Sequence, residues 1–249
     1  MFNPAAYDSG QIKNLVGAQL DNREGQTNTQ PERFDDVIRE YIDFVNSQVR
    51  AYMDAMGGFA GHRIRVERQV HRANRPTSVR KNAKGEQVVV WSSYEDPSKP
   101  DIVHQSIMRA EDYLAANADG GANEQQQSRA VIIFLHTYWE DEIRPRLAKA
   151  KAVDKNNIGS DIMGDLTVLR NVILHAKGIV RPDKHRRLKT LNSMFPADQE
   201  VRFSYEGMHQ IFVLIKQDLS RLMLEWLGAN GGTLKPDDIK DIAIQRINR

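Results

Sequence analysis

The sequence predicts a mainly α-helical protein, an antiparallel helical bundle that carries a small β-hairpin insert. Long segments repeat apolar residues every three or four positions, which is the period of an amphipathic helix. A shorter region between residues 62 and 97 changes to a period of two and is rich in β-branched residues. Clusters of glycine, proline and asparagine separate these segments and favour short connections between neighbouring helices.

Composition sets limits on the class of protein. The 249 residues are enough for one large domain, or for one domain with an elaboration. The chain has no cysteine, so disulfides and thiolate zinc sites are excluded. No apolar run approaches about 18 residues, and the N-terminus lacks the basic-then-apolar pattern of a signal peptide. We therefore expect a cytoplasmic protein that does not use a membrane.

The chain divides by pattern into four predicted parts. Residues 1–30 are polar and form an N-terminal arm, and residues 31–97 form a helix followed by the hairpin. Residues 98–228 hold four helices of a bundle, and residues 229–249 form a C-terminal tail. A net charge of +2 for the whole chain says little about partners, so local charge clusters are more informative.

The first long helix is expected from Pro31 to about Met56, where Gly57 and Gly58 should end it. The alternation in residues 62–67 and the β-branched run in residues 87–92 predict two strands joined by a long basic loop. Either this loop binds a nucleic-acid backbone, or its charges protect a solvated edge strand from aggregation. The candidate backbone ligands are Arg63, Arg65, Arg72, Arg75, Arg80 and Lys81.

Three further helices are predicted, two before residues 161–178 and one after them. Ser98 and the early proline after it resemble a capping box and predict a helix to about residue 118. A second helix is expected from Asn123 until Pro145 kinks or ends it. The last major helix should begin at Ser204, its N-cap. The predicted buried side of the second helix consists of Val131, Phe134, Leu135, Tyr138 and Trp139.

The helix predicted over residues 161–178, with Ser160 as N-cap, has two distinct faces. One apolar stripe suits the core of a bundle; it consists of Ile162, Leu166, Leu169, Ile173 and Ala176. On roughly the opposite side lies a second stripe of small and mixed character, which consists of Gly164, Val168, Asn171 and His175. We expect this second stripe to face away from the core and to pack against a partner, with Gly164 and Val168 as dimer contacts.

The stretch from Arg170 through Asn171 to His175 resembles the signature of HEPN domains, in which an arginine and a polar residue precede a histidine inside an apolar helix. HEPN proteins are all-helical and usually dimeric, and many are metal-independent ribonucleases whose motif copies meet across the dimer seam. The resemblance therefore implies a HEPN-like bundle and a homodimer. It also implies a cytoplasmic endoribonuclease of the toxin or antiviral-defence kind that needs no cofactor or metal, with RNA and an antitoxin or defence-system protein as partners.

The chemistry that this resemblance implies suits the three residue types. His175 would exchange a proton with the ribose 2′-hydroxyl or the leaving oxygen, and Arg170 would stabilise the charge on the phosphate. Asn171, four residues before His175, would orient the imidazole or a substrate oxygen. Alternatively, His175 is an interface histidine and Arg170 an ordinary charge at the edge of the core. A second basic cluster follows the motif and consists of Lys177, Arg181, Lys184, Arg186 and Arg187.

Two alternatives to this interpretation remain open. The chain could be a non-catalytic helical nucleic-acid-binding or adaptor protein that uses both basic clusters to hold phosphates. His136 and Glu140, with Glu142 nearby, have a spacing that can hold a metal on a helix face, but no matching pair occurs on another helix, which favours a surface cluster. One of the acids at 140–142 could instead pair with Arg170.

Overall fold

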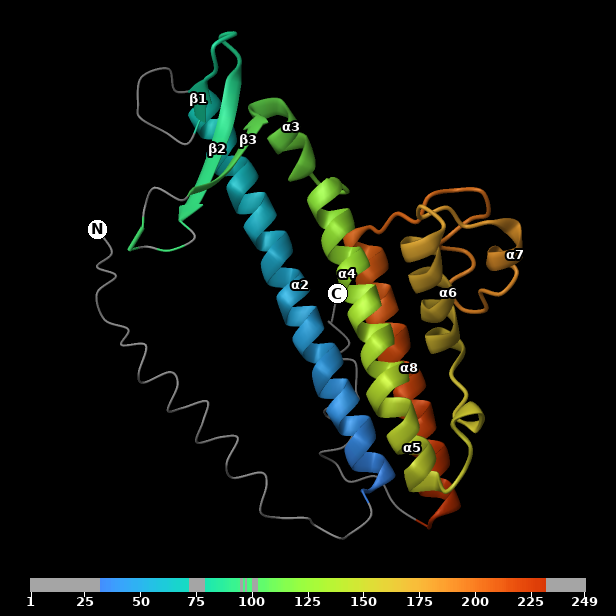
Figure 1. The fold of residues 1–249 in the computed structure, drawn as a ribbon. Helices are drawn as coiled ribbons and strands as arrows, with labels where there is room; N and C mark the ends of the chain where they lie inside the picture. The colour runs from blue at the N-terminus through green and yellow to red at the C-terminus, as the bar shows by residue number, and fades with distance from the viewer. Residues whose placement is uncertain (1–31, 72–78, 95, 97, 100–102, 232–249) are drawn as a thin grey trace, which may run out of the picture. The chain divides into compact units, whose positions relative to one another are not determined.

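The computed structural model describes residues 32–71, 79–94, 96, 98–99 and 103–231. These residues form a mainly helical structure with a small three-stranded antiparallel sheet (Figure 1). The predicted N-terminal arm lies outside the described residues, as do Arg72 and Arg75 and most of the predicted C-terminal tail. Within the described part, no helix is both long and apolar enough to cross a membrane.

The first long helix, α2, runs from Phe34 to Val70 and does not end at the glycines where the sequence predicted an end. It continues through Gly57, Gly58 and Gly61, although each interior glycine costs about 1 kcal/mol relative to alanine. The predicted strand over residues 62–67 is therefore wrong. Val66 is buried while Ile64 is 42% exposed, so the alternating apolar residues do not share one face as they would in a strand.

The sheet contains β1 (Val79–Lys81), β2 (Gln87–Tyr94) and β3 (Val103–Arg109), in that order and all antiparallel. The prediction of β2 is confirmed, but its partners differ from the predicted hairpin. Val88 pairs with Arg80 on one side and with Arg109 on the other. The helix predicted from Ser98 is also wrong, because residues 103–109 form β3 and only Ala110–Ala116 form a helix, α3.

The second long helix passes through Pro145 instead of ending there. Helix α4 (Ala122–Tyr138) continues into a π-helical turn, η1 (Trp139–Ile143), and then into α5 (Arg144–Lys151). The proline is the second residue of α5 and follows the π-helical turn, and its fixed φ is compatible with the helix. On the predicted buried side of α4 and η1, Phe134 is instead 58% exposed.

The remaining elements are a short 3-10 turn, η2 (Lys155–Asn157), and helices α6 (Asp161–His175), α7 (Pro182–His185) and α8 (Tyr205–Ala229). Ser160 and Ser204 cap α6 and α8 as predicted: the side chain of Ser160 accepts from the Met163 amide and that of Ser204 from the Gly207 amide. Each hydroxyl satisfies one amide of its helix's first turn, so the two starts could be read from local sequence.

The core of the bundle is shared by α2, α4, η1, α5, α6 and α8. Helix α2 therefore takes the place in this bundle that the sequence assigned to a helix from Ser98. A hydrogen bond from the Tyr41 hydroxyl to the Leu135 carbonyl, at 2.9 Å, joins α2 to α4 inside the core. A second, smaller cluster packs the C-terminal half of α2 against the sheet and α3; it consists of Val66, Val89, Ala110 and Tyr113.

Candidate functional site

Arg170 and Asn171 contact each other on α6. The Arg170 guanidinium donates from Nη1 to Oδ1 of Asn171 at 2.9 Å, and both side chains are half-buried. Because the carboxamide oxygen of Asn171 accepts this bond, its NH₂ group remains available to donate to a substrate or to a neighbour one turn away. Asn171 and Arg170 thus act as one polar unit with a fixed orientation.

His175 is the last residue of α6 and is exposed to solvent. It has no hydrogen bond or ion pair to any residue in the described part of the chain. Its position four residues after Asn171 puts both side chains on one side of the helix, whereas Arg170 lies about 140° around the axis from it. The helix therefore brings together Arg170 and Asn171, and places His175 next to Asn171 at an open helix end.

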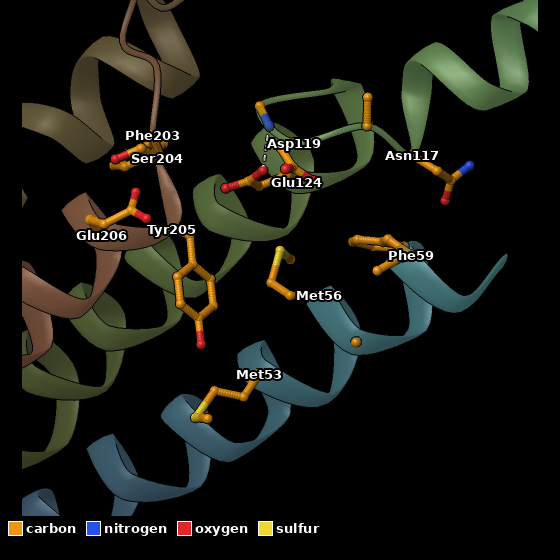
Figure 2. Close-up of a pocket in the computed structure, with 14 residues that line it drawn as sticks. Met53, Met56, Phe59, Asn117, Asp119, Glu124, Phe203, Ser204, Tyr205 and Glu206 are labelled. Carbon is orange, nitrogen blue, oxygen red and sulfur yellow. Dashed lines mark hydrogen bonds between the residues drawn. The ribbon is translucent and has the colours of Figure 1, made fainter. Parts of the chain in front are cut away.

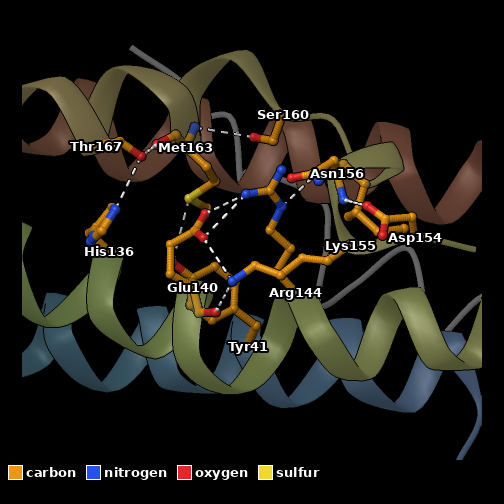
Figure 3. A network of polar contacts seen from close by, with 11 residues as sticks. Tyr41, His136, Glu140, Arg144, Asp154, Lys155, Asn156, Ser160, Met163 and Thr167 are labelled. Atoms are coloured by element: carbon orange, nitrogen blue, oxygen red, sulfur yellow. Dashed lines mark hydrogen bonds and ion pairs between the residues drawn. The ribbon is translucent and has the colours of Figure 1, made fainter.

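The acids at 140–142 do not partner Arg170. Glu140 instead forms ion pairs with Arg144 at 2.9 Å and with Lys155 at 3.2 Å (Figure 3). No ion pair joins Arg170 to Asp141 or Glu142 among the residues that the structure describes. The expectation of an acidic partner for Arg170 is therefore wrong for Glu140, which is used to hold the η2 region against η1.

The imidazole of His136 links α4 to α6. The Thr167 hydroxyl donates to the Met163 carbonyl at 3.0 Å, so it accepts from the imidazole Nε2 of His136, 3.1 Å away (Figure 3). Nδ1 is buried without a hydrogen-bond partner in the described structure. Burial lowers the pKa of His136, and the nearby Arg170 charge lowers it further, although Glu140 opposes both effects.

This arrangement makes a metal site at His136 and Glu140 untenable. The carboxylate of Glu140 forms ion pairs with Arg144 and Lys155. The Nε2 atom of His136 donates to Thr167, and its Nδ1 atom is buried. Among the described residues, no group of three potential metal ligands lies close enough to hold an ion. The partner of His136 could not have been found from the sequence, because Thr167 lies 31 residues away with no local signal.

The second stripe of α6 is less exposed than predicted. Gly164 and His175 are exposed and Asn171 is half-buried, but Val168 is only 3% exposed and belongs to the core. The expectation that the whole stripe faces away from the core is wrong at Val168, because α6 packs against both α4 and α8. Of the two residues predicted as dimer contacts, only Gly164 remains on the surface.

The basic segment after the motif is held beside α6 by a buried carboxylate that the sequence analysis missed. Asp165 is 1% exposed and accepts hydrogen bonds from the backbone amides of Lys189, Thr190 and Leu191, at 2.7–2.8 Å. A signal was present: Asp165 lies between Ile162 and Leu169 on the apolar face of α6, and an acid on such a face needs a buried partner.

The side chains of this segment remain available to solvent. Arg181, Arg186 and Arg187 are exposed and form no ion pair among the described residues, and Lys177 is exposed with a left-handed backbone (φ 54°). Lys184 is half-buried and pairs with Asp183 at 3.6 Å. Because Asp165 fixes the backbone that follows, the segment presents a positive surface beside α6.

The basic residues of the first cluster are distributed differently. Arg63 and Arg65 lie on α2, and Arg63 is near Glu67 and Asp119, both at 3.9 Å. Arg80 and Lys81 are exposed on the short strand β1. The described members of this cluster therefore belong to a helix and a strand, and not to one loop.

Comparison with protein-family models, curated proteins and solved structures finds no match to this chain. Its function is therefore inferred from its own residues and their geometry.

Proposed function

We propose that this protein is a metal-independent endoribonuclease that cleaves single-stranded RNA with Arg170, Asn171 and His175. The observation that carries the proposal is the pairing of Arg170 with Asn171 beside an exposed His175 at the end of α6. An arginine with a fixed orientation, a free amide NH₂ and an accessible imidazole are the groups that metal-free cleavage of a phosphodiester needs.

Cleavage of the RNA backbone by this route requires three side chains. The His175 imidazole accepts the proton of the ribose 2′-hydroxyl, and the 2′-oxygen forms a bond to phosphorus. The bond from phosphorus to the 5′-oxygen breaks, and this oxygen takes a proton from water. The Arg170 guanidinium stabilises the additional negative charge on the phosphate, and the Asn171 NH₂ group donates to the same oxygens or to the ring. The products are a 2′,3′-cyclic phosphate and a 5′-hydroxyl.

The exposed arginines after the motif support substrate binding next to these residues. Arg181, Arg186 and Arg187 offer positive charge in the segment that follows His175, and phosphate contacts of this kind hold a backbone without reading its sequence. The same surface supports the second candidate function, a non-catalytic nucleic-acid-binding or adaptor protein. The two functions share a ligand and differ in whether His175 acts on it.

A toxin or antiviral-defence role, with a homodimer and an antitoxin or defence-system partner, belongs to the same proposal. Leu174, which precedes His175 on α6 and is 47% exposed, supports a protein contact beside the motif. The mass measured by light scattering tests the dimer, and a monomer at micromolar concentration would remove it.

The test of cleavage uses a fluorophore-labelled single-stranded RNA in excess chelator. We expect wild-type protein to cut it, and His175→Ala and Arg170→Ala to lower the rate by about 100-fold or more. His136→Gln is the matched control, because His136 is a structural histidine in contact with Thr167; it should cut at near the wild-type rate. RNA binding without cleavage by the wild type would favour the non-catalytic function, and full activity in both alanine variants would exclude this motif.

A further inference from the structure

A cavity of about 550 Å³, which shares no residue with the motif, lies between α2, the turn that joins α3 to α4, and the start of α8 (Figure 2). Its walls include Met53, Met56 and Phe59 of α2 and Tyr205 of α8. Thioether and aromatic side chains give an adaptable apolar surface that suits a flat organic group. The volume lies in the range that holds small organic ligands.

The charged residues that line the cavity all have the same sign. Glu124 is in the wall and only 6% exposed, and Asp119 and Glu206 are exposed at the rim. Among the described residues, the lining contains no lysine, arginine or histidine, although Arg63 lies 3.9 Å from Asp119 behind the rim. A ligand here would therefore meet the carboxylates of Glu124 and Glu206 next to aromatic faces, which is the combination that attracts an organic cation.

Within the described part of the chain, the hydrogen-bond donors to Glu124 are uncharged. One carboxylate oxygen accepts from the Gly120 amide, and the other lies 3.5 Å from the Tyr52 hydroxyl. The N-terminus of α4 offsets part of the cost of burying this charge. A glutamine could accept the same bond from Gly120, so the structure of the turn does not explain why a full negative charge is present.

The wall opposite α2 is built before any ligand binds. Gln125 forms two hydrogen bonds with the backbone of Phe203, to its carbonyl at 2.7 Å and from its amide at 2.8 Å. A Cβ atom at Gly121 would lie within 2.7 Å of three carbonyl oxygens, so only glycine fits this turn. These contacts fix the α3–α4 turn against the start of α8, and the cavity needs little rearrangement to be filled.

The glycines of α2 leave this helix open to solvent, and one of them lies at the cavity. Gly57 lines this cavity, and a Cβ atom there would meet nothing within 4 Å. Packing inside the chain therefore does not require a glycine at a position where glycine weakens the helix. A ligand can therefore lie directly against the backbone of α2 at Gly57.

We propose that this cavity binds an organic cation, an ammonium group carried on an aromatic or similarly flat apolar body. The ammonium group pairs with Glu124, and the apolar body packs between Phe59, Tyr205 and the methionines of α2, against the open backbone at Gly57. This site is independent of the ribonuclease proposal and shares no residue with it.

The first test measures binding by titration calorimetry of three probes with the same ring system. Tryptamine carries the ammonium group, tryptophol replaces it with a hydroxyl, and indole-3-acetate carries a negative charge. We expect tryptamine to bind at least 10-fold more tightly than tryptophol, and indole-3-acetate not to bind. Equal affinity for tryptamine and tryptophol would overturn the proposal.

Variants then locate the site. Glu124→Gln keeps the bond to Gly120 and should lower tryptamine affinity at least 10-fold with tryptophol unchanged. If it fails to fold, the exposed double variant Asp119→Asn, Glu206→Gln provides the test, with a smaller expected loss in the same direction. Gly57→Leu should raise the melting temperature and abolish binding, whereas Gly61→Leu, which does not line the cavity, should raise it and leave binding intact. Intact binding in Gly57→Leu would exclude this cavity.

Discussion

The two basic clusters of this protein look alike in sequence but are built differently. The cluster after the motif is a single segment whose backbone is tied to α6 by the buried carboxylate of Asp165. The described part of the other cluster is spread over the C-terminal half of α2 and over β1, where Glu67 and Asp119 lie near Arg63. A similar density of basic residues therefore gives a surface with a fixed backbone after the motif, and a partly neutralised surface on α2.

The strongest test of this difference removes the carboxylate of Asp165, which holds the basic segment after the motif. In Asp165→Ala, three backbone amides lose an acceptor inside the protein, so we expect the free energy of unfolding to fall by about 3–5 kcal/mol. Urea denaturation measures this loss, and Asp161→Ala, which removes only the exposed pair with Lys189, is the control and should change stability by less than about 1 kcal/mol. Similar effects in the two variants would show that Asp165 does not hold the segment.

The next test asks which cluster contacts nucleic acid. The paired replacements Arg186→Gln, Arg187→Gln and Arg65→Gln, Arg68→Gln each remove two exposed charges; Arg68 lies on α2 three residues after Arg65. We expect the first pair to reduce the slope of log affinity against log salt concentration by about 1–2, because each lost phosphate contact removes counterion release. The second pair should reduce it by less, because acids near α2 already lower the local potential.

Fluorescence anisotropy with a labelled single-stranded RNA, measured between low and physiological salt, gives both slopes. His175→Ala serves as the control, because it should stop cleavage without changing the salt slope. Equal reductions in the two paired variants would mean that one continuous interface includes both clusters.

Local signals predicted the parts of this fold that local interactions determine. Ser160 and Ser204 were identified as caps because the amides that they satisfy lie three residues away. The course of α2 was not predicted, because Val66 holds its C-terminal half through contacts with β2 and α3 that only the folded chain creates. Of the two outcomes predicted for Pro145, an end of the helix is wrong, because a π-helical turn over residues 139–143 lets the helix continue.

In the candidate site, too, the sequence predicted the residues that are close together in the chain, but not the contacts between distant residues. The motif residues were found because they lie within six positions of one another on one helix, and the structure adds the contact between Arg170 and Asn171. The roles of Asp165 and His136 depend on partners 24 to 31 residues away, so spacing alone could not reveal them. Val168 was assigned to a partner surface because the sequence does not show that α6 packs against two helices.

The smallest effect is expected where a carboxylate tether is exposed instead of buried. Glu40 of α2 forms two hydrogen bonds with Arg146 of α5, at 2.6 and 2.8 Å, and also accepts one from Tyr138, but its side chain is 42% exposed. Arg146 first, and Tyr138 to a lesser extent, lower the pKa of Glu40 from 4.5 to about 2, while burial acts in the opposite direction. A carboxylate whose pKa is lower in the folded state stabilises the fold above its unfolded pKa, and this contribution is lost as pH falls from about 4.5 toward 2.

Because solvent screens the ion pair between Glu40 and Arg146, we expect Glu40→Gln to lower the free energy of unfolding by only about 0.5–1 kcal/mol at pH 7. Urea titrations at pH 7, 4 and 2.5 should show this difference shrinking in that order, with Asp54→Asn on the same helix as a control that changes little at any pH. A difference in the free energy of unfolding that stays constant down to pH 2.5 would contradict the assigned pKa of Glu40. A difference as large as that of Asp165→Ala would show that burial does not determine how much each carboxylate stabilises the fold.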